Sequence, residues 1–389
     1  MTAAHARGRL RAARELLAPP GFDRYRLTPR KLLNLWLARW EEHRGRTRLR
    51  SRPWKLTVEA SNLCNLQCPA CFTGVDELGR PRGSLPVDLY RKLLDELGPY
   101  LFELEFYNWG EPLLHKQLES MIAEATGRGI STTVSTNFSL PFDAARAERL
   151  VASGLAVLGV SIDGARQETY EQYRVRGKLA RVLDNCRLVA DAKRRLGSTT
   201  PRMVWEFHVF EHNEGDVAEA SRLARELGME IAVSKGWTVG KEWNPASEYR
   251  FFWYPVPPAR CSFLWHQAVV NNDGGVAPCC GTFYQEDDMG RLAVGTAELG
   301  TAATFAEIWN GERFRTARAL FQKRAGGDDA RALACFECPL TKVWERWGMH
   351  RGLGGTLGGF DPGYGTNDCF NYFWERRPAR PASARGGAR

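Results

Sequence analysis

The sequence predicts an α/β protein in which six strand–helix units form a partial barrel or an open doubly wound sheet, followed by a loop-rich metal-binding domain. From about Trp54 to Gly236, short β-branched or apolar runs alternate with stretches of helical periodicity. Such alternation predicts parallel strands, because a tight turn cannot join two parallel neighbours. After Gly236 the alternation stops, and six of the ten cysteines lie between Cys261 and Cys369. Clustered cysteines with little regular periodicity are typical of a small domain held by metal.

The predicted strands share short runs of β-branched and apolar residues: Trp54–Ala60, Leu101–Tyr107, Ile130–Thr136, Leu155–Ile162, Met203–Phe210 and Met229–Ser234. Helical periodicity between them predicts helices over Val87–Leu97, Gln117–Arg128, Asp143–Ser153, Ala180–Arg194 and Glu214–Leu227. Six units are two short of the eight that close a barrel, which favours the partial (β/α)6 form or the open sheet. In both architectures, functional residues gather at the carboxyl ends of the strands.

These patterns predict four regions along the chain. They are a basic N-terminal helical arm (1–50), the strand–helix domain (51–236), the cysteine-containing domain (237–375) and a disordered basic tail (376–389). Within the arm, Lys31–Glu42 is amphipathic at best, because Leu and Trp side chains cover much of its circumference.

Charge separates the ends of the chain from its body. The formal net charge is +9, but residues 1–55 carry +11 and residues 376–389 carry +5, which leaves −7 between them. A net acidic body cannot offer nucleic acid a wide positive face, so no nucleic-acid partner is expected. The arm could instead dock on the barrel, on a protein partner or peripherally on a membrane surface.

The sequence shows neither a membrane-spanning segment nor a secretory signal, and this predicts where the protein is located. No apolar run approaches the ~20 residues of a membrane span. The N-terminus has Arg every few residues and no apolar segment, unlike a secretory signal. We therefore expect a cytoplasmic protein with reduced thiols, in which cysteines serve as metal ligands or catalytic groups.

Three cysteines directly follow the first predicted strand. Cys64, Cys68 and Cys71 have the spacing C-x3-C-x2-C in the segment EASNLCNLQCPACF. Three thiolates in one loop can ligate three corners of a four-iron cluster and leave the fourth iron open for a small molecule. Zinc is the alternative, but the trio is one ligand short of a closed tetrahedral site.

This pattern resembles the radical S-adenosylmethionine (radical SAM) family, which has a six-unit partial barrel and this cysteine trio. Its Gly-Gly-Glu-Pro motif at the end of the second strand is matched by Gly110, Glu111 and Pro112 in YNWGEPLLH, with Trp109 in place of the first glycine. Exposed backbone groups and a carboxylate at a strand end can hold the ammonium of a methionine moiety. The resemblance implies a four-iron cluster and S-adenosylmethionine as cofactors, with the three cysteines as catalytic ligands.

The resemblance also implies further cofactor contacts at the ends of the next strands. Ser135 and Asn137 resemble the turn that contacts the ribose, Ser161 ends the fourth strand, and Phe72 resembles the aromatic residue near the adenine. Arg174 is the better candidate for the cofactor carboxylate, with Arg176 close by. Ordinary strand-end turn chemistry is an equally good interpretation of Ser135, Asn137 and Ser161.

The second group of cysteines resembles the auxiliary-cluster domain of such enzymes, called SPASM or, in its short form, twitch. The segment WHQAVVNNDGGVAPCCGTF predicts a hairpin that delivers a cysteine pair, and a CxxC follows later. We expect one auxiliary four-iron cluster held by Cys261, Cys279, Cys335 and Cys338, because the sixth residue past Cys338 is a tryptophan where the full pattern has cysteine. Cys280 could replace Cys279, since neighbours on a strand point to opposite faces, and a zinc ribbon is the alternative.

The resemblance implies an oxidoreductase that cleaves S-adenosylmethionine reductively to a 5′-deoxyadenosyl radical and abstracts hydrogen from a substrate. The expected substrate is a polyol or aminosugar-type small molecule or a peptide, with the auxiliary cluster as electron acceptor and a reductant such as flavodoxin or ferredoxin as partner. The alternatives are a radical SAM peptide maturase, an epimerase with a thiol donor, and a non-catalytic zinc-binding module. Cys186 and Cys369 are most simply buried thiols.

Overall fold

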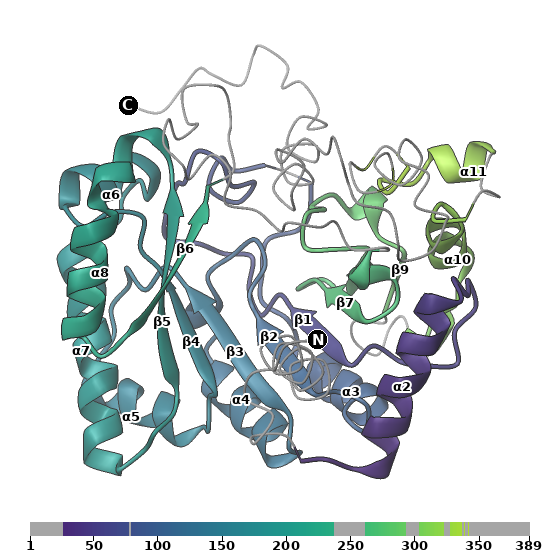
Figure 1. Ribbon diagram of the computed structural model, residues 1–389, viewed down its shortest axis with the longest axis horizontal. Helices are drawn as coiled ribbons and strands as arrows, with labels where there is room; N and C mark the ends of the chain where they lie inside the picture. Colours follow the sequence, from purple (N-terminus) through teal and green to yellow (C-terminus); the bar gives the residue numbers. More distant parts are fainter. Residues whose placement is uncertain are drawn as a thin grey trace, which may run out of the picture.

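The computed structural model describes residues 26–77, 79–236, 261–292, 303–322, 327–336, 338 and 341. Its centre is a sheet of nine strands in the order β6-β5-β4-β3-β2-β1-β7-β8-β9 (Figure 1). The first six strands run parallel: β1 (Lys55–Val58), β2 (Glu103–Phe106), β3 (Ser131–Thr136), β4 (Val157–Ser161), β5 (Arg202–Val209) and β6 (Glu230–Lys235). Every predicted strand is present, with ends displaced by at most two residues.

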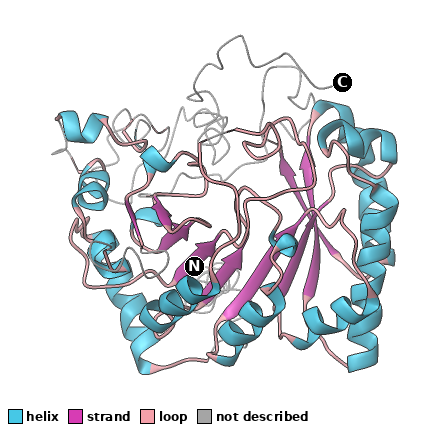
Figure 2. Ribbon diagram, turned by 180° about the vertical axis from the view of Figure 1, so that it is seen from behind, coloured by secondary structure: helices cyan, strands magenta, loops and turns pink. Residues whose placement is uncertain are grey.

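Helices connect these strands and lie along the outer side of the sheet (Figures 1 and 2). They are α3 (Val87–Leu97), α4 (Leu118–Gly127), α5 (Ala144–Ala152), α6 (Gln167–Tyr173), α7 (Leu179–Leu196) and α8 (Val217–Glu226). Asp143 caps α5 by accepting from the Arg146 backbone N–H, and Gly197 ends α7 in the left-handed conformation. All five predicted helices form, and α6 is an additional helix that the periodicity did not reveal. The fold is thus the α/β partial barrel that the sequence predicted.

The two faces of the strands differ in polarity. The apolar members of each alternating pattern belong to the hydrophobic core: Leu104, Phe106, Leu158, Val160, Trp205 and Phe207. Their strand neighbours line an open cavity instead: Glu105, Ser135, Ser161, Glu206 and His208. Because successive side chains on a strand point to opposite faces, the face away from the core is available for polar chemistry.

The predicted hairpin forms, and its first strand extends the barrel sheet. Strand β7 (Gln267–Val270) pairs in parallel with β1, from Lys55 opposite Gln267 to Val58 opposite Val270. Strands β8 (Gly275–Ala277) and β9 (Gly290–Arg291) continue the sheet in antiparallel fashion. This continuity could not be predicted from the sequence, because pairing between strands about 200 residues apart leaves no local pattern.

Short helices complete the part after the hairpin. They are α9 (Phe305–Trp309), α10 (Glu312–Ala319) and α11 (Asp328–Arg331). Elsewhere in the chain, short 3₁₀ helices span Pro112–Leu114, Glu211–Asp216, Ser262–Leu264 and Gln285–Asp287. Arg318 of α10 is fully buried and donates to the carbonyl oxygens of Leu264 (2.6 Å), Trp309 (2.8 Å) and Thr47 (2.9 Å). This one side chain therefore ties the cysteine-containing part to the end of the N-terminal arm.

Within the arm, helix α2 spans Pro29–His43, close to the predicted Lys31–Glu42. Thr28 caps it, and Pro29 occupies the first turn, where the missing N–H costs nothing. The predicted tail (376–389) and Cys369 lie outside the described residues. None of the helices that the structure describes is both long and apolar enough for a membrane crossing.

Candidate functional site

The cysteine trio lies in the loop after β1 and borders a cavity of about 370 Å³ at the carboxyl ends of the strands. The Leu66 backbone N–H points at the Cys64 sulfur from 3.4 Å, and the Asn137 amide lies 3.6 Å from the same sulfur. The Arg174 guanidinium lies 3.9 Å from the Cys68 sulfur. Nearby N–H donors and a cation are the surroundings that stabilise a negatively charged metal–thiolate group.

Without metal, these thiols hold their protons. Burial raises the pKa of all three cysteines, that of Cys68 to about 12. None of the nine described cysteines is in a disulfide. Metal must therefore displace protons on binding, and a thiol-only donor set suits an iron–sulfur cluster.

The geometry does not suggest a single-ion site. Among the described residues, no group of three or more His, Cys, Asp or Glu side chains could hold a metal ion. A four-iron cluster is wider than an ion and takes its thiolates at separate corners, which three cysteines in one loop can supply.

Glu111 is held rigidly beside the trio. Its carboxylate accepts from the Thr136 hydroxyl (2.7 Å), the Asn137 backbone N–H (2.8 Å) and the Leu113 backbone N–H (3.0 Å). Burial nevertheless raises the pKa of Glu111. A buried carboxylate of this kind is stabilised by a cationic ligand, such as an ammonium group.

The residues on either side of Glu111, Gly110 and Pro112, shape the backbone of this turn. A side chain at Gly110 would run into the Ser61 carbonyl, so glycine permits the close approach of the two strand ends. Pro112 opens a 3₁₀ turn and is buried, outside the cavity lining.

Trp109, which replaces the first glycine of the motif, contacts both the segment after β1 and the segment after β8. Its backbone N–H donates to Glu59 (3.1 Å), and its indole N–H donates to the Thr282 carbonyl (3.1 Å). Its ring packs edge-on against Phe72 with the centroids 4.7 Å apart, and Phe72 stacks on Phe283 at 4.9 Å. Phe72 is thus buried in an aromatic cluster and is not among the residues that line the cavity.

Arg174 lines the cavity and forms an ion pair with the fully buried Asp163 (2.6 Å). Burial alone would raise the pKa of Asp163, but Arg174 and His208 hold it at about 2. Asp163 is therefore ionised at neutral pH and fixes the guanidinium. Arg176 has a positive φ of 71° and does not line the cavity.

Ser135, Asn137 and Ser161 also line the cavity, at the ends of β3 and β4. Both serine hydroxyls donate to the same oxygen of Glu206 on β5, at 2.7 Å from Ser135 and 3.1 Å from Ser161. A side chain on Gly159 would collide with this carboxylate, so the glycine keeps space for it.

The sequence reasoning missed the two carboxylates of the cavity wall. Glu105 accepts from the hydroxyls of Thr57 (3.0 Å) and Tyr107 (3.1 Å) and pairs with Lys55 (2.7 Å). Among the described residues, Glu206 accepts side-chain hydrogen bonds from the two serines and forms no ion pair with a Lys or Arg. The available signal was the strand alternation, which places Glu105 and Glu206 on the face opposite the core.

The second group of cysteines comes together beside the hairpin. Burial raises the pKa of Cys279 well above its usual range, and the neighbouring Cys280, Cys335, Cys261 and Cys338 raise it further. Cys280 also lines the first cavity, where Glu105 adds to the effect of burial on its pKa, raised to about 12. Cys280 thus borders the first cavity, while both adjacent cysteines lie near other cysteines of the second group: Cys279 near Cys335, Cys261 and Cys338, and Cys280 near Cys261.

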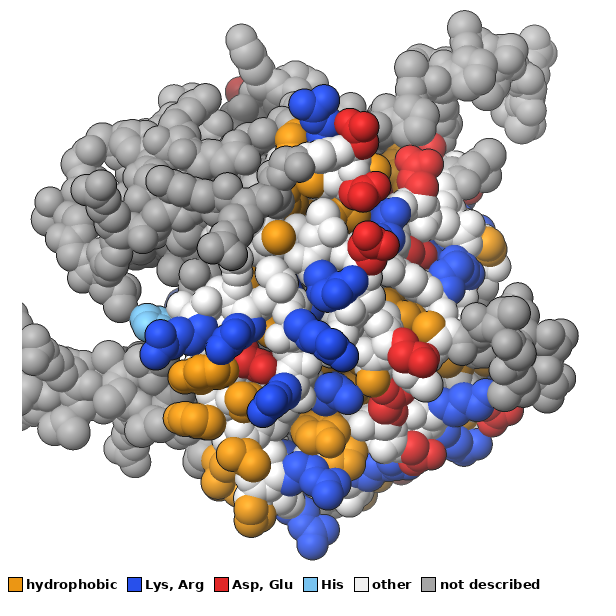
Figure 3. Space-filling view, turned by 90° about the vertical axis from the view of Figure 1, so that its right-hand side faces the viewer, with side chains coloured by type: hydrophobic (Ala, Val, Ile, Leu, Met, Phe, Trp, Pro, Cys, Tyr) orange, Lys and Arg blue, Asp and Glu red, His pale blue; other side chains and the backbone are white. Residues whose placement is uncertain are grey.

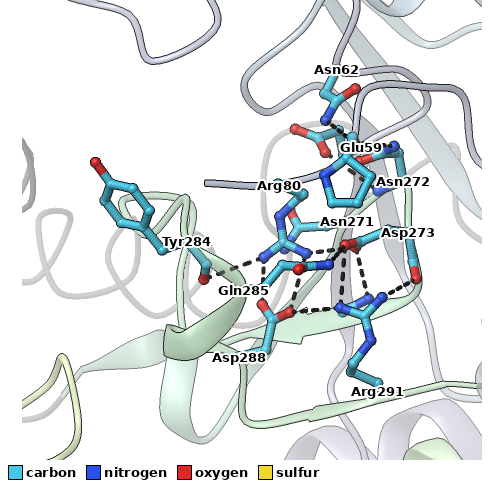
Figure 4. A network of polar contacts seen from close by, with 12 residues as sticks. Glu59, Asn62, Arg80, Asn271, Asn272, Asp273, Tyr284, Gln285, Asp288 and Arg291 are labelled. Atoms are coloured by element: carbon cyan, nitrogen blue, oxygen red, sulfur yellow. Dashed lines mark hydrogen bonds and ion pairs between the residues drawn. The ribbon is translucent and has the colours of Figure 1, made fainter. Parts of the chain in front are cut away.

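A buried polar network joins the two cysteine-bearing parts (Figure 4). Arg80, from the loop after the trio, is almost fully buried and pairs with Asp288 (2.6 Å) and Asp273 (2.5 Å). It also donates to the carbonyls of Phe283 (3.1 Å) and Tyr284 (3.5 Å). Because a buried charge without its partners is costly, Arg80 holds the hairpin against the loop of the trio.

Two family models match the chain. The radical SAM superfamily model matches residues 58–206, and the model of an iron–sulfur cluster-binding domain, SPASM, matches residues 261–339. The first match includes the trio and the turn of Glu111, and the second includes Cys261, Cys279, Cys280, Cys335 and Cys338.

Curated relatives match shorter stretches. An AdoMet-dependent heme synthase from Methanosarcina barkeri is 29% identical over 178 residues, 45% of this chain and 47% of that protein. A PqqA peptide cyclase from Granulibacter bethesdensis is 29% identical over 141 residues, 36% of this chain and 37% of that protein. The chain thus spans less than half the length of these relatives.

Among solved structures, SuiB from Streptococcus suis bound to S-adenosylmethionine has a TM-score of 0.54 at 12% identity. The superposition covers 82% of this chain and 81% of that one. At this identity the likeness concerns the fold alone.

Proposed function

Because this chain belongs to the radical SAM superfamily and carries an iron–sulfur cluster-binding domain, we propose that it is an oxidoreductase that abstracts hydrogen from a small molecule bound in the barrel cavity. One observation carries the proposal: three cysteine thiols, a buried carboxylate and an arginine border one cavity at the carboxyl ends of the strands.

Each group has a role in this proposal. Cys64, Cys68 and Cys71 would hold the first four-iron cluster, and Cys261, Cys279, Cys335 and Cys338 the auxiliary one. When bound, the first cluster and S-adenosylmethionine would supply radical chemistry for hydrogen abstraction, and the auxiliary cluster would supply an electron acceptor.

The protein's own contribution is to bind and orient. Glu111 receives the ammonium of the methionine moiety, because its carboxylate is already fixed by three donors. Arg174, which Asp163 fixes through an ion pair, would bind the cofactor carboxylate. Ser135 and Asn137, which line the cavity, would contact the ribose. Phe72 and Pro112 would not contact the cofactor directly but would hold the turn of Glu111 in place by packing.

The opposite wall of the cavity supports a polar substrate. Both serines bond to one oxygen of Glu206, which leaves its other oxygen available to ligands, and Glu105 and Tyr107 also line the cavity. Carboxylates accept hydrogen bonds from hydroxyl and ammonium groups. This wall supports a polyol or aminosugar-type substrate, whereas the match to a peptide cyclase supports a peptide with a polar side chain at the same position.

The test is anaerobic reconstitution with iron, sulfide, S-adenosylmethionine and a strong reductant, followed by measurement of 5′-deoxyadenosine. The wild-type protein and Cys186→Ala should form it, because Cys186 is buried in the core of α7 away from the cavity. Cys68→Ala should form none. If the iron-loaded wild type forms no 5′-deoxyadenosine, with or without candidate substrates, the proposal is wrong.

A further inference from the structure

Helix α2 presents an apolar surface to solvent. Among the described residues, seven large hydrophobic side chains are exposed, and five of them belong to this short segment: Leu27, Leu32, Leu33, Trp36 and Trp40. Leu33 and Trp36 are the most exposed, at 64% and 63%. With 3.6 residues per turn, positions 32, 33, 36 and 40 fall on one side of the helix. We call the five residues the α2 patch.

The helix binds the rest of the protein through its polar side instead. Lys31 donates to the Gly129 carbonyl (2.8 Å), and the Asn34 side chain exchanges two hydrogen bonds with the Arg52 backbone (2.8 and 2.9 Å). Buried Glu41 accepts from the backbone N–H groups of Arg50 (2.7 Å) and Ser51 (3.1 Å). Surface helices usually bury their apolar side, so the reversed orientation leaves the α2 patch free for another contact.

The surroundings of the patch are cationic. Residues 26–50 carry seven exposed arginines: Arg26, Arg30, Arg39, Arg44, Arg46, Arg48 and Arg50. The acids in this range are Glu41, which is buried, and Glu42, which pairs with His266 (3.0 Å). The Arg46 guanidinium lies 5.4 Å from the centre of the Trp40 ring. Figure 3 shows hydrophobic side chains gathered beside Lys and Arg side chains on this face of the molecule.

We propose that the α2 patch docks the protein on an anionic lipid membrane surface. Leu and Trp side chains in one stripe insert at the boundary of headgroups and acyl chains, and arginines around them contact anionic headgroups. The absence of exposed acids in residues 26–50 favours an anionic partner over a mixed-charge protein surface. The apolar stripe favours a lipid surface over nucleic acid, which requires a polar, cationic face. This inference does not depend on the proposed reaction.

The test is co-sedimentation of the full chain with vesicles of phosphatidylcholine alone or mixed with phosphatidylserine. Binding should require phosphatidylserine and weaken as salt screens the headgroups. The double variant L33E/W36E should bind at least about tenfold more weakly, because two apolar contacts become anionic. Arg39→Glu should weaken binding to phosphatidylserine vesicles without changing the fold.

Leu196→Glu is the matched control, because Leu196 is 50% exposed at the end of α7, outside the patch. It should bind as the wild type does. Circular dichroism and thermal melting of each variant separate lost docking from lost folding. The proposal is wrong if the wild type does not bind phosphatidylserine vesicles. It is also wrong if L33E/W36E binds them as strongly as the wild type does. Self-association that L33E/W36E abolishes in sedimentation velocity without any vesicle binding also overturns it, because the patch would then join two copies.

Discussion

Single buried charges set the chemistry of the cavity, and Glu111 is the clearest example. Three donors fix its carboxylate, so loss of one negative charge should change ligand affinity without moving the backbone. We expect Glu111→Gln to weaken S-adenosylmethionine binding about tenfold or more, as for a charge-assisted contact. Binding can be measured by calorimetry on iron-loaded protein. Glu148→Gln, on the exposed side of α5, is the control, and an unchanged affinity in Glu111→Gln would remove this residue from the cofactor site.

Glu206 should act on substrate rather than on cofactor. Glu206→Gln keeps the shape of the side chain and its serine contacts but removes the charge. We expect unchanged 5′-deoxyadenosine formation without substrate, and at least about tenfold lower kcat/KM for substrates with an amine. Gly159→Ala should reproduce this loss, because its methyl group displaces the Glu206 carboxylate. Weaker S-adenosylmethionine binding in Glu206→Gln would instead assign the carboxylate to the cofactor.

Asp163 gives a pH dependence of stability with a defined sign. Its pKa is about 2 in the folded protein, held there by Arg174 and His208 against the effect of burial, and about 3.9 in an unfolded chain. The ion pair therefore stabilises the fold fully above about pH 4 and is lost as the pH falls through about 2. The contribution is about 3 kcal/mol. Urea unfolding should show Asp163→Asn destabilised at pH 7 but close to wild type at the lowest pH where both fold, and an equal difference at both pH values would contradict the assignment.

At the scale of elements, the turn after β2 and the turn after the hairpin are joined by Trp109. We expect Trp109→Phe to lower the free energy of unfolding by about 1 kcal/mol, because the indole bond to the Thr282 carbonyl is lost while most ring packing stays. Trp109→Gly restores the residue typical of the motif and should cost more, since it leaves a cavity against Phe72. Chemical denaturation of the two variants checks the order, and a Phe variant less stable than the Gly variant would contradict it.

The sequence predicted the elements well because their signals are local. Strand alternation and helical periodicity located β1 to β6, and the trio is contained in eight residues after β1. The remaining features depend on distant contacts. Neither the pairing of β7 with β1, nor the contact of Trp109 with Thr282, nor the convergence of Ser135, Ser161 and Glu206 leaves a local pattern. The polar side of α2 docks inward through specific hydrogen bonds, which hydrophobic periodicity cannot reveal.

At the scale of the whole molecule, β7 covers the edge of β1, so the two family matches meet in one sheet. A chain that ends at Gly236 would leave the β1 edge unpaired and expose the core residues around Leu56 and Val58. We expect this truncated protein to aggregate or to melt well below the full chain. Size-exclusion chromatography and thermal melting check this, and a monomeric truncated protein with an unchanged melting temperature would show that β7 is dispensable.

We expect one chain to hold two separate iron–sulfur clusters, one beside the cavity and one beside the hairpin. Iron analysis of anaerobically reconstituted protein, combined with electron paramagnetic resonance after reduction, tests it most directly. The wild type should contain about eight irons, and Cys68→Ala and Cys335→Ala should each retain about four, with different residual spectra. Zinc in place of iron, or identical residual spectra in the two variants, would contradict the account.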